Sequence, residues 1–214
     1  MSAAGPPQGA KAPPGGSEVH AVTSVGATSS ARDGDWRTYD QDSPYSSPWT
    51  TTQKVRMLLW DLTWLFMCRW TPKPLNGWRI WWLKRHGARI HGRPFVHQRA
   101  RIALPWNLTL HDRACLGDGA VAYSLGEIEI MPDATIAQEA YLCTGTHDFH
   151  NRVRPLRTGR ILIGTSAFVG ARAFVMPGVR IGDGAIVGAC SVVTRDVDAD
   201  ARVAGNPARP LHNT

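Results

Sequence analysis

The sequence is poor in cysteine and lacks a secretory signal. Its 214 residues include four cysteines, with no C-x-x-C pair and no spacing typical of a zinc site, so we expect reduced thiols in a cytoplasmic protein. These are Cys68, Cys115, Cys143 and Cys190. No charged N-terminal region is followed by an apolar one, which argues against a signal peptide.

Acidic residues are also scarce, with 17 Asp and Glu against 24 Lys and Arg, and the net charge is +7 with a pI of about 9.7. Such a balance indicates an anionic partner. The sequence has no recognised nucleic-acid motif and its basic residues do not interleave with aromatic ones, so we expect no nucleic acid. Two groups of arginines fit a phosphorylated small molecule better: Arg152, Arg154, Arg157 and Arg160, then Arg195, Arg202 and Arg209.

The N-terminal segment contains few aliphatic residues and is rich in Pro, Gly, Ser and Ala. Such a composition cannot bury enough apolar surface to offset the entropy lost on ordering. We therefore expect residues 1–50 to be mostly disordered.

A Trp-rich helical hairpin is expected over residues 51–88, because eight of the nine tryptophans lie before residue 90. Residues 50–52 can cap a first helix, which is too short to span a bilayer, and a second is expected over 75–86. The first helix carries one apolar stripe: Val55, Leu58, Leu59, Leu62, Leu65 and Phe66. Two interpretations stay open: the hairpin packs on the rest of the protein or on a neighbouring subunit, or it lies in a membrane interface.

From residue 110 to residue 197 the chain repeats every six residues, which fits neither a helix nor simple strand alternation and is typical of a parallel β-helix. A branched aliphatic starts each hexad: Leu110, Leu116, Ile130, Ile136, Leu142, Ile163, Val169, Val175, Ile181, Val187 and Val193. Four places later stands a usually small residue: Ala114, Ala120, Ala134, Ala140, Thr146, Ala167, Ala173, Val179, Ala185, Ser191 or Val197. We expect the aliphatics to fill a triangular prism and the small residues to turn its corners.

The prism is expected over residues 89–200, followed by a C-terminal tail over 201–214. Three irregularities interrupt the repeat, at 104–107, at 122–126 and, longest of all, after Leu142. The last places an excursion at 147–162. Long excursions from a rigid scaffold are common places for catalytic and binding groups.

Six motifs stand out in and around the repeat: Leu104-Pro105-Trp106-Asn107-Leu108, Tyr123-Ser124-Leu125-Gly126, Thr144-Gly145-Thr146-His147-Asp148, Met176-Pro177-Gly178-Val179, residues 188–197 and Ala204-Gly205-Asn206-Pro207-Ala208-Arg209. They resemble motifs of the hexapeptide-repeat acyltransferases, and most closely those of the sugar O-acetyltransferases of colanic-acid and exopolysaccharide biosynthesis. The resemblance covers residues 85–210, and the Trp-rich segment before them looks like this subgroup too. The resemblance implies an all-β fold, a left-handed parallel β-helix, and a homotrimer with acetyl-CoA bound between neighbouring prisms.

The resemblance also assigns roles to residues. His147 matches the catalytic histidine, and an imidazole is the natural base to take a proton from a sugar hydroxyl. Either Asp148 or a backbone carbonyl would orient its ring. The backbone N–H groups of Ala171 and Ala189 would bind the pantetheine arm or the thioester oxygen. Further contacts to the nucleotide and phosphates are implied for Thr194, Arg195 and Arg209, and Tyr123 and Ser124 either face the acceptor sugar or serve as turn residues.

The chain departs from many relatives at three positions of the expected CoA groove. Arg195 stands where many carry Lys, Phe168 where many carry Trp, and Cys190 where many carry Gly. Arg195 should still serve as a phosphate-binding cation. The other two changes could alter the groove.

Four alternatives stay open. His111 and His147 could belong to a zinc hydratase of the carbonic-anhydrase type, although Arg152 stands where its third histidine is expected. Cys143 could accept an acyl group, the chain could be a non-catalytic scaffold, and serine or another amine could be the acceptor. We expect an acetyl-CoA-dependent O-acetyltransferase that modifies a sugar for a surface polysaccharide, needs no metal, and works in the cytoplasm or at the inner face of the membrane.

Overall fold

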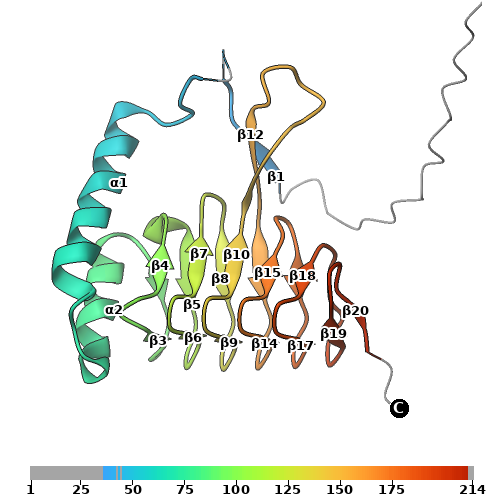
Figure 1. Cartoon of the computed structure of the whole chain (residues 1–214). Coiled ribbons are helices and arrows are strands. Elements are labelled where there is room, and N and C mark those ends of the chain that lie inside the picture. The colour runs from blue at the N-terminus through green and yellow to red at the C-terminus, as the bar shows by residue number, and fades with distance from the viewer. Residues whose placement is uncertain (1–35, 42, 44, 212–214) are drawn as a thin grey trace, which may run out of the picture.

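The structure is a parallel β-helix whose N-terminal end is covered by helices (Figure 1). The computed structural model of the chain describes residues 36–41, 43 and 45–211. The expectation of disorder over residues 1–50 therefore falls mostly outside the described residues. Within them, Trp36–Thr38 forms a strand, β1.

Three parallel sheets form the sides of the prism, and each coil gives one strand to each. The first sheet contains β2 (Arg89–Ile90), β5 (Leu108–Leu110), β8 (Ile128–Ile130), β13 (Ile161–Ile163) and β16 (Arg180–Ile181). The second contains β3 (Phe95–Val96), β6 (Cys115–Leu116), β9 (Thr135–Ile136), β14 (Phe168–Val169), β17 (Ile186–Val187) and β19 (Arg202–Ala204), with β20 (Arg209–Pro210) antiparallel at its end. The third contains β4 (Arg101–Ile102), β7 (Val121–Tyr123), β10 (Tyr141–Cys143), β15 (Phe174–Val175) and β18 (Val192–Val193).

The hexad pattern explains the core. All eleven repeating aliphatics are buried, and they stack in register from coil to coil, as Leu142 does on Val175. Ten of the eleven corner residues are buried too. The exception is Thr146, which lies half-buried in a hairpin outside the prism. The predicted β-helix is confirmed.

The three irregularities of the repeat all lie at the same edge of the prism. In every coil the chain runs from the first sheet to the second and then the third, so residues between the third and first sheets form one edge, called here the third–first edge. The bulges at 103–107 and 124–127 stack there, and residues 144–160 extend from it. The 103–107 bulge contains a 3-10 turn, η4 (Pro105–Asn107).

The long excursion is an antiparallel hairpin of β11 (Gly145–His147) and β12 (Leu156–Gly159) that stands out from the prism (Figure 1). Strand β1 pairs with the other side of β12, with Arg37 opposite Thr158. A three-stranded antiparallel sheet, in the order β1-β12-β11, therefore carries the tip of the excursion.

The helical segment contains α1 (Thr51–Thr63), the π-helical turn η2 (Trp64–Cys68), the 3-10 turn η3 (Lys73–Leu75) and α2 (Asn76–Arg85). Thr50 caps α1 in a capping box with Gln53, as the threonines at 50–52 predicted. Among the described residues, no helix is both long and apolar enough to cross a membrane.

The helices pack on the first coil through polar contacts that the sequence pattern did not indicate. The indole N–H groups of Trp60 and Trp64 donate to the Ile102 and Ala100 carbonyls at 2.7 and 3.0 Å. Arg79 is fully buried and donates to the Val96 carbonyl at 2.8 Å. These donors satisfy backbone carbonyls around the prism's first coil, which would otherwise be buried without a partner.

The predicted apolar stripe of α1 therefore does not pack against the prism. Its six residues are exposed, and the opposite face, with Trp60 and Trp64, is buried instead. An indole offers both a large apolar surface and a hydrogen-bond donor, which aliphatic side chains lack.

Candidate active site

His147 is the last residue of β11 and its side chain is exposed. Its Nδ1 lies 2.8 Å from the carbonyl oxygen of Arg154. A carbonyl can only accept, so this contact assigns the proton to Nδ1 and leaves Nε2 with its lone pair free. An imidazole in that tautomer can accept a proton from an approaching hydroxyl.

Asp148 has a different place in the hairpin. Its carboxylate accepts a hydrogen bond from the backbone N–H of His150 at 3.0 Å, and its own N–H donates to the Pro155 carbonyl. Of the two groups proposed to orient the His147 ring, the structure places a backbone carbonyl, that of Arg154, beside it. Asp148 stabilises the turn that brings Arg154 back to the histidine.

The residues that hold the hairpin include a segment that sequence reasoning missed. Tyr39 donates its backbone N–H to the Leu156 carbonyl at 2.9 Å, and the Gln41 side-chain oxygen accepts from the Leu156 N–H at 2.8 Å. The Arg157 guanidinium lies over the Trp36 ring, 4.9 Å from its centroid. Two aromatic residues in an otherwise polar stretch were the only signal in the sequence that residues 36–41 were ordered.

Beneath the hairpin, Thr144 and Ser124 connect the stacked bulges. The Thr144 hydroxyl donates to the Tyr123 carbonyl at 2.6 Å and accepts from the Gly126 N–H at 2.8 Å. The Ser124 hydroxyl donates to the Leu104 carbonyl and accepts from the Leu104 N–H, at 2.9 and 3.0 Å. Ser124 is fully buried, so of its two predicted roles the structure supports the turn residue and not the contact to an acceptor.

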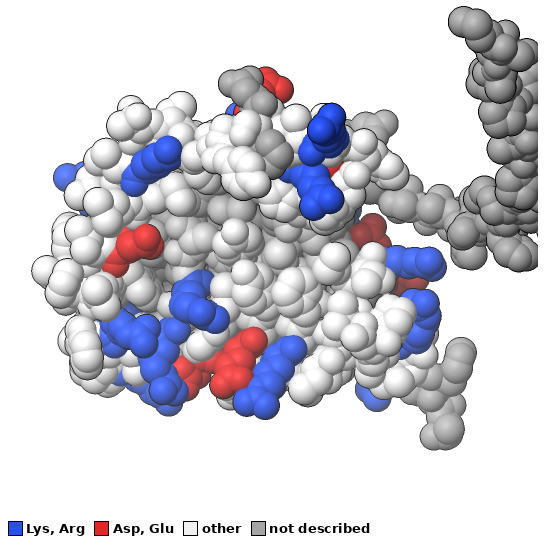
Figure 2. Space-filling model, turned by 45° about the horizontal axis from the view of Figure 1, so that its top comes forward, with Lys and Arg blue, Asp and Glu red and all other residues white. Residues whose placement is uncertain are grey.

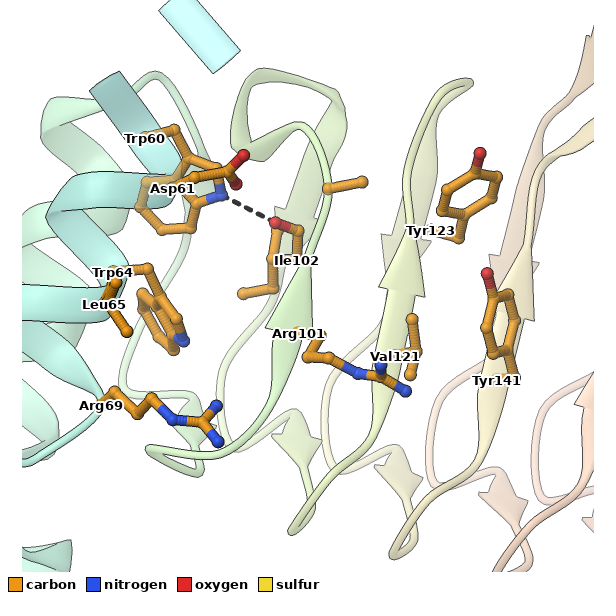
Figure 3. A pocket seen from close by; sticks show the side chains of 11 residues that line it. Trp60, Asp61, Trp64, Leu65, Arg69, Arg101, Ile102, Val121, Tyr123 and Tyr141 are labelled. Carbon is orange, nitrogen blue, oxygen red and sulfur yellow. Dashed lines mark hydrogen bonds between the residues drawn. The ribbon is translucent and has the colours of Figure 1, made fainter. Parts of the chain in front are cut away.

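Tyr123, in contrast, lines a groove between α1 and the third sheet (Figure 3). The groove has a volume of about 410 Å³. The Tyr123 and Tyr141 rings lie side by side with centroids 5.9 Å apart, and the guanidinium groups of Arg69 and Arg101 reach into the same space. Burial raises the pKa of Tyr123, so its hydroxyl stays protonated at neutral pH and can donate a hydrogen bond.

Ala171 and Ala189 occupy equivalent turns, one coil apart, at the edge between the second and third sheets. Within the described part of the chain, neither N–H donates a hydrogen bond to another protein group. A Cβ on Gly170 would lie 2.6 Å from the Ala189 nitrogen, so the glycine permits the two turns to stack closely. Two stacked turns with free N–H groups fit an extended ligand that carries carbonyl oxygens.

Thr194 and Arg195 are exposed at the third–first edge, on the side of the third sheet where His147 also lies. Arg209 is exposed in β20, at the C-terminal end of the second sheet. Within one chain, the width of the third sheet therefore separates the histidine from the free N–H groups of Ala171 and Ala189. A site that uses both needs a second copy of the chain or a ligand that crosses the sheet.

The zinc interpretation has no geometric support. Among residues 36–41, 43 and 45–211, no group of three or more His, Cys, Asp and Glu is arranged to hold a metal ion. His111 contacts Glu129 at 2.9 Å and stacks on His91, with ring centroids 4.8 Å apart, while His147 lies in the hairpin.

Cys143 is half-buried and donates to the Gly145 carbonyl at 3.3 Å. Burial raises the pKa of its thiol. A thiol that stays protonated at neutral pH is a poor nucleophile, so the structure favours a packing role for this cysteine over an acyl-accepting one.

Comparisons with known proteins agree with this fold. Residues 160–195 match the family model described as bacterial transferase hexapeptide (six repeats). The chain is 38% identical over 154 residues, 72% of its length, to "Putative colanic acid biosynthesis acetyltransferase WcaF" of Escherichia coli K12, of which the match covers 85%. It is 35% identical over 91 residues, 39% of its length, to "Putative acetyltransferase YvoF" of Bacillus subtilis, of which the match covers 53%.

Solved structures show the same fold. A hexapeptide-repeat acetyltransferase from Vibrio cholerae in complex with acetyl-CoA matches with a TM-score of 0.69 and 20% identity, over 78% of this chain and 92% of that one. A maltose O-acetyltransferase from Clostridium difficile matches with a TM-score of 0.65 and 22% identity, over 76% and 88%. The chain belongs to the hexapeptide-repeat acetyltransferases, in the family of the colanic acid relative WcaF.

Proposed function

We propose that this acetyltransferase transfers the acetyl group of acetyl-CoA to a hydroxyl of a sugar, with His147 as the general base. The observation that carries the proposal is the hydrogen bond from His147 Nδ1 to the Arg154 carbonyl, because it leaves Nε2 free on an exposed face. Acetyl-CoA supplies an acyl group already activated as a thioester, so no protein nucleophile is required.

The reaction needs one proton to move. As the sugar oxygen forms its bond to the acetyl carbon, Nε2 of His147 takes the hydroxyl proton. The carbon–sulfur bond breaks, and the imidazolium returns the proton to the departing sulfur. The Arg154 carbonyl stabilises the imidazolium through the Nδ1 hydrogen bond and keeps the ring at a fixed angle.

We further propose that the active enzyme is a homotrimer in which a neighbouring chain completes each site. The free N–H groups of Ala171 and Ala189 lie across the third sheet from His147 of the same chain. A second copy can place its own pair of turns against the His147 edge, with the pantetheine arm between the two chains. The exposed cations Arg195 and Arg209, with Thr194, suit the phosphates and the nucleotide.

The groove beside Tyr123 is our candidate for the acceptor. The groove is lined by paired tyrosine rings and by two arginines against one carboxylate, that of Asp61, which suits a sugar that carries negative charge or is linked to a phosphate. The colanic acid relative favours a sugar on its way to a surface polysaccharide. We place the reaction in the cytoplasm, where the four free thiols stay reduced.

The proposal is tested by measuring acetyl transfer by the purified full chain. The assay uses labelled acetyl-CoA and a panel of sugars, sugar nucleotides and amines. His147→Ala should lower kcat by about 10²–10⁴. His150→Ala is the matched control, because His150 is exposed in the same hairpin, and it should keep nearly full activity. Equal rates for wild type and His147→Ala would remove the histidine from the mechanism. If only the amines accepted the acetyl group, the proposed sugar acceptor would be wrong.

A further inference from the structure

Helix α1 has two apolar faces, and the prism covers only one of them. At about 100° per residue, the stripe that Val55, Leu58, Leu59 and Leu62 form on α1, and that Leu65 and Phe66 continue on η2, lies opposite the buried Trp60 of α1 and Trp64 of η2. The exposed fractions of its side chains run from 42% at Leu62 to 63% at Phe66. A contiguous apolar surface of this kind marks a contact with a partner or a membrane.

Exposed aromatic residues continue this stripe beyond the end of α1. The Trp78 indole N–H donates to the Met67 carbonyl at 2.8 Å, which holds α2 against the end of η2. Trp81 stacks on Trp78 with centroids 5.6 Å apart, and both are exposed, at 50% and 43%. Trp70 is 78% exposed in the turn that follows η2. The stripe and these three tryptophans are called the helical face below.

The charge of the chain is concentrated around the helical face. Residues 50–90 contain eight Lys and Arg and one Asp, a net charge of +7, which equals the net charge of the whole chain. Within the described residues, six of the seven exposed cations of this segment form no ion pair; Arg89 alone has a partner, Glu127. Two of the six face the prism: Arg56 stacks on Trp106, and Arg69 reaches into the groove beside Tyr123. The four that remain for a partner are Lys54, Lys73, Lys84 and Arg85.

The rest of the folded chain is nearly balanced in charge, because residues 91–214 contain 13 Arg and 11 Asp and Glu, a net charge of +2. Arg99 pairs with Asp118, Arg113 with Asp133, and Arg172 with Glu139, each carboxylate coming from a following or preceding coil. The excess of positive charge therefore belongs to the helices and is not a general property of the surface. Figure 2 shows the helical end, at the left, as mostly white with blue side chains along its margins.

We propose that the helical face docks on an anionic lipid bilayer, with the α1 stripe and the exposed indoles in the headgroup region and the cations against the lipid phosphates. An amphipathic helix with lysine and arginine beside its apolar face, and tryptophans at its end, has the composition of an interfacial helix. Anionic lipid supplies the negative charge that the protein lacks here. A second copy of the same face would bring two positively charged surfaces together, which repel each other.

The geometry suits a peripheral enzyme. The helical face lies at the N-terminal end of the prism and points away from it, while the His147 hairpin stands out from the side (Figure 1). In a trimer of parallel prisms, three such faces would meet one bilayer together, and each would raise the effective concentration of the others. Docking on a bilayer requires no acetyl transfer, so its test is independent of the proposed activity.

Flotation of the full-length protein with vesicles tests the proposal. We compare pure phosphatidylcholine with a mixture containing about one third phosphatidylglycerol. Wild type should float with the anionic vesicles and bind neutral ones much more weakly. The double substitution Leu58→Glu/Leu62→Glu should reduce binding about tenfold or more. Tyr45→Glu, at a residue 98% exposed outside the helices, is the control and should bind like wild type.

The charge contribution is tested separately. Lys84→Gln and Arg85→Gln should each weaken binding to anionic vesicles about fivefold, whereas Arg180→Gln removes the same charge from the prism and should have little effect. These conservative variants keep the test valid even if the double glutamate substitution impairs folding. Circular dichroism and light scattering accompany every variant.

Three results would overturn the proposal. Wild type could fail to float with anionic vesicles, or it could bind neutral and anionic vesicles equally. The third is a change in solution mass on Leu58→Glu/Leu62→Glu, without any change in lipid binding, which would show that the helical face joins copies of the chain.

Discussion

The His147 hairpin is held by a segment distant in sequence, and this makes a quantitative prediction for Gln41→Ala. The Gln41 side-chain oxygen accepts from the Leu156 N–H at 2.8 Å, beside the three residue pairs that join β1 to β12. A hydrogen bond of this kind contributes about 1 kcal/mol. Losing it should raise the population of the open hairpin about fivefold.

Hydrogen exchange of the backbone amides measures this opening directly, because exchange of a locally opened segment follows its population. In Gln41→Ala, amides of residues 145–159 should exchange about fivefold faster, while those of β8 and β9 keep their wild-type rates. Tyr45→Ala is the control. Unchanged exchange in the hairpin would refute the bracing role of residues 36–41, and equal acceleration in β8 and β9 would show a general loss of stability instead.

Three further predictions concern stability and reactivity. Ser124→Ala leaves the Leu104 N–H and carbonyl without their partner and should cost about 1–3 kcal/mol, measured as a lower thermal midpoint. Cys190 is exposed and should react with iodoacetamide at pH 8, whereas Cys68 should not react, because burial raises the pKa of its thiol to about 12. Labelling of Cys68 in the native protein would contradict its buried position. The hydrogen bond from Arg99 lowers the pKa of Asp118 below its value in the unfolded chain, so this ion pair stabilises the fold above about pH 4 and stops doing so as the pH falls. In Asp118→Asn, the free energy of unfolding should therefore depend less on pH in the acid range. An unchanged dependence on pH would contradict this role of Asp118.

The sequence predicts the prism well because its pattern has one physical cause. An aliphatic residue every six positions can be buried only if three short strands make one turn, so Leu142 and Val175 had to stack. The same reasoning failed at Ala122, which occupies the inward position between Ile102 and Leu142. An alanine there does not stand out as a core residue, so the second coil looked more irregular than it is.

The helices show where hydrophobic periodicity misleads. Counting apolar residues on α1 favours the aliphatic stripe, but the prism selects Trp60 and Trp64 because their N–H groups reach backbone carbonyls. A pattern based on hydrophobicity cannot weigh that hydrogen bond. Arg79, fully buried and bonded to the Val96 carbonyl, is missed for the same reason.

The candidate site was predictable in part. The motif around His147 identified the residue, but only the fold shows Arg154 returning to its ring and residues 36–41 pairing with β12. The first contact joins residues on the two sides of a turn, and the second joins segments more than one hundred residues apart. Local composition carries no information about such pairings.

The central claim, that each site joins His147 of one chain to the Ala171 and Ala189 turns of another, is tested most directly by complementation. His147→Ala removes the base, and Ala189→Pro removes the Ala189 N–H. Each variant alone should be nearly inactive. When the two variants are co-expressed in equal amounts, mixed trimers should recover about one quarter of wild-type activity. Half of the chains carry an intact histidine, and half of their neighbours carry an intact turn, so about one quarter of the sites have both. Mixed trimers that stay inactive, or an Ala189→Pro variant that is fully active alone, would contradict the account.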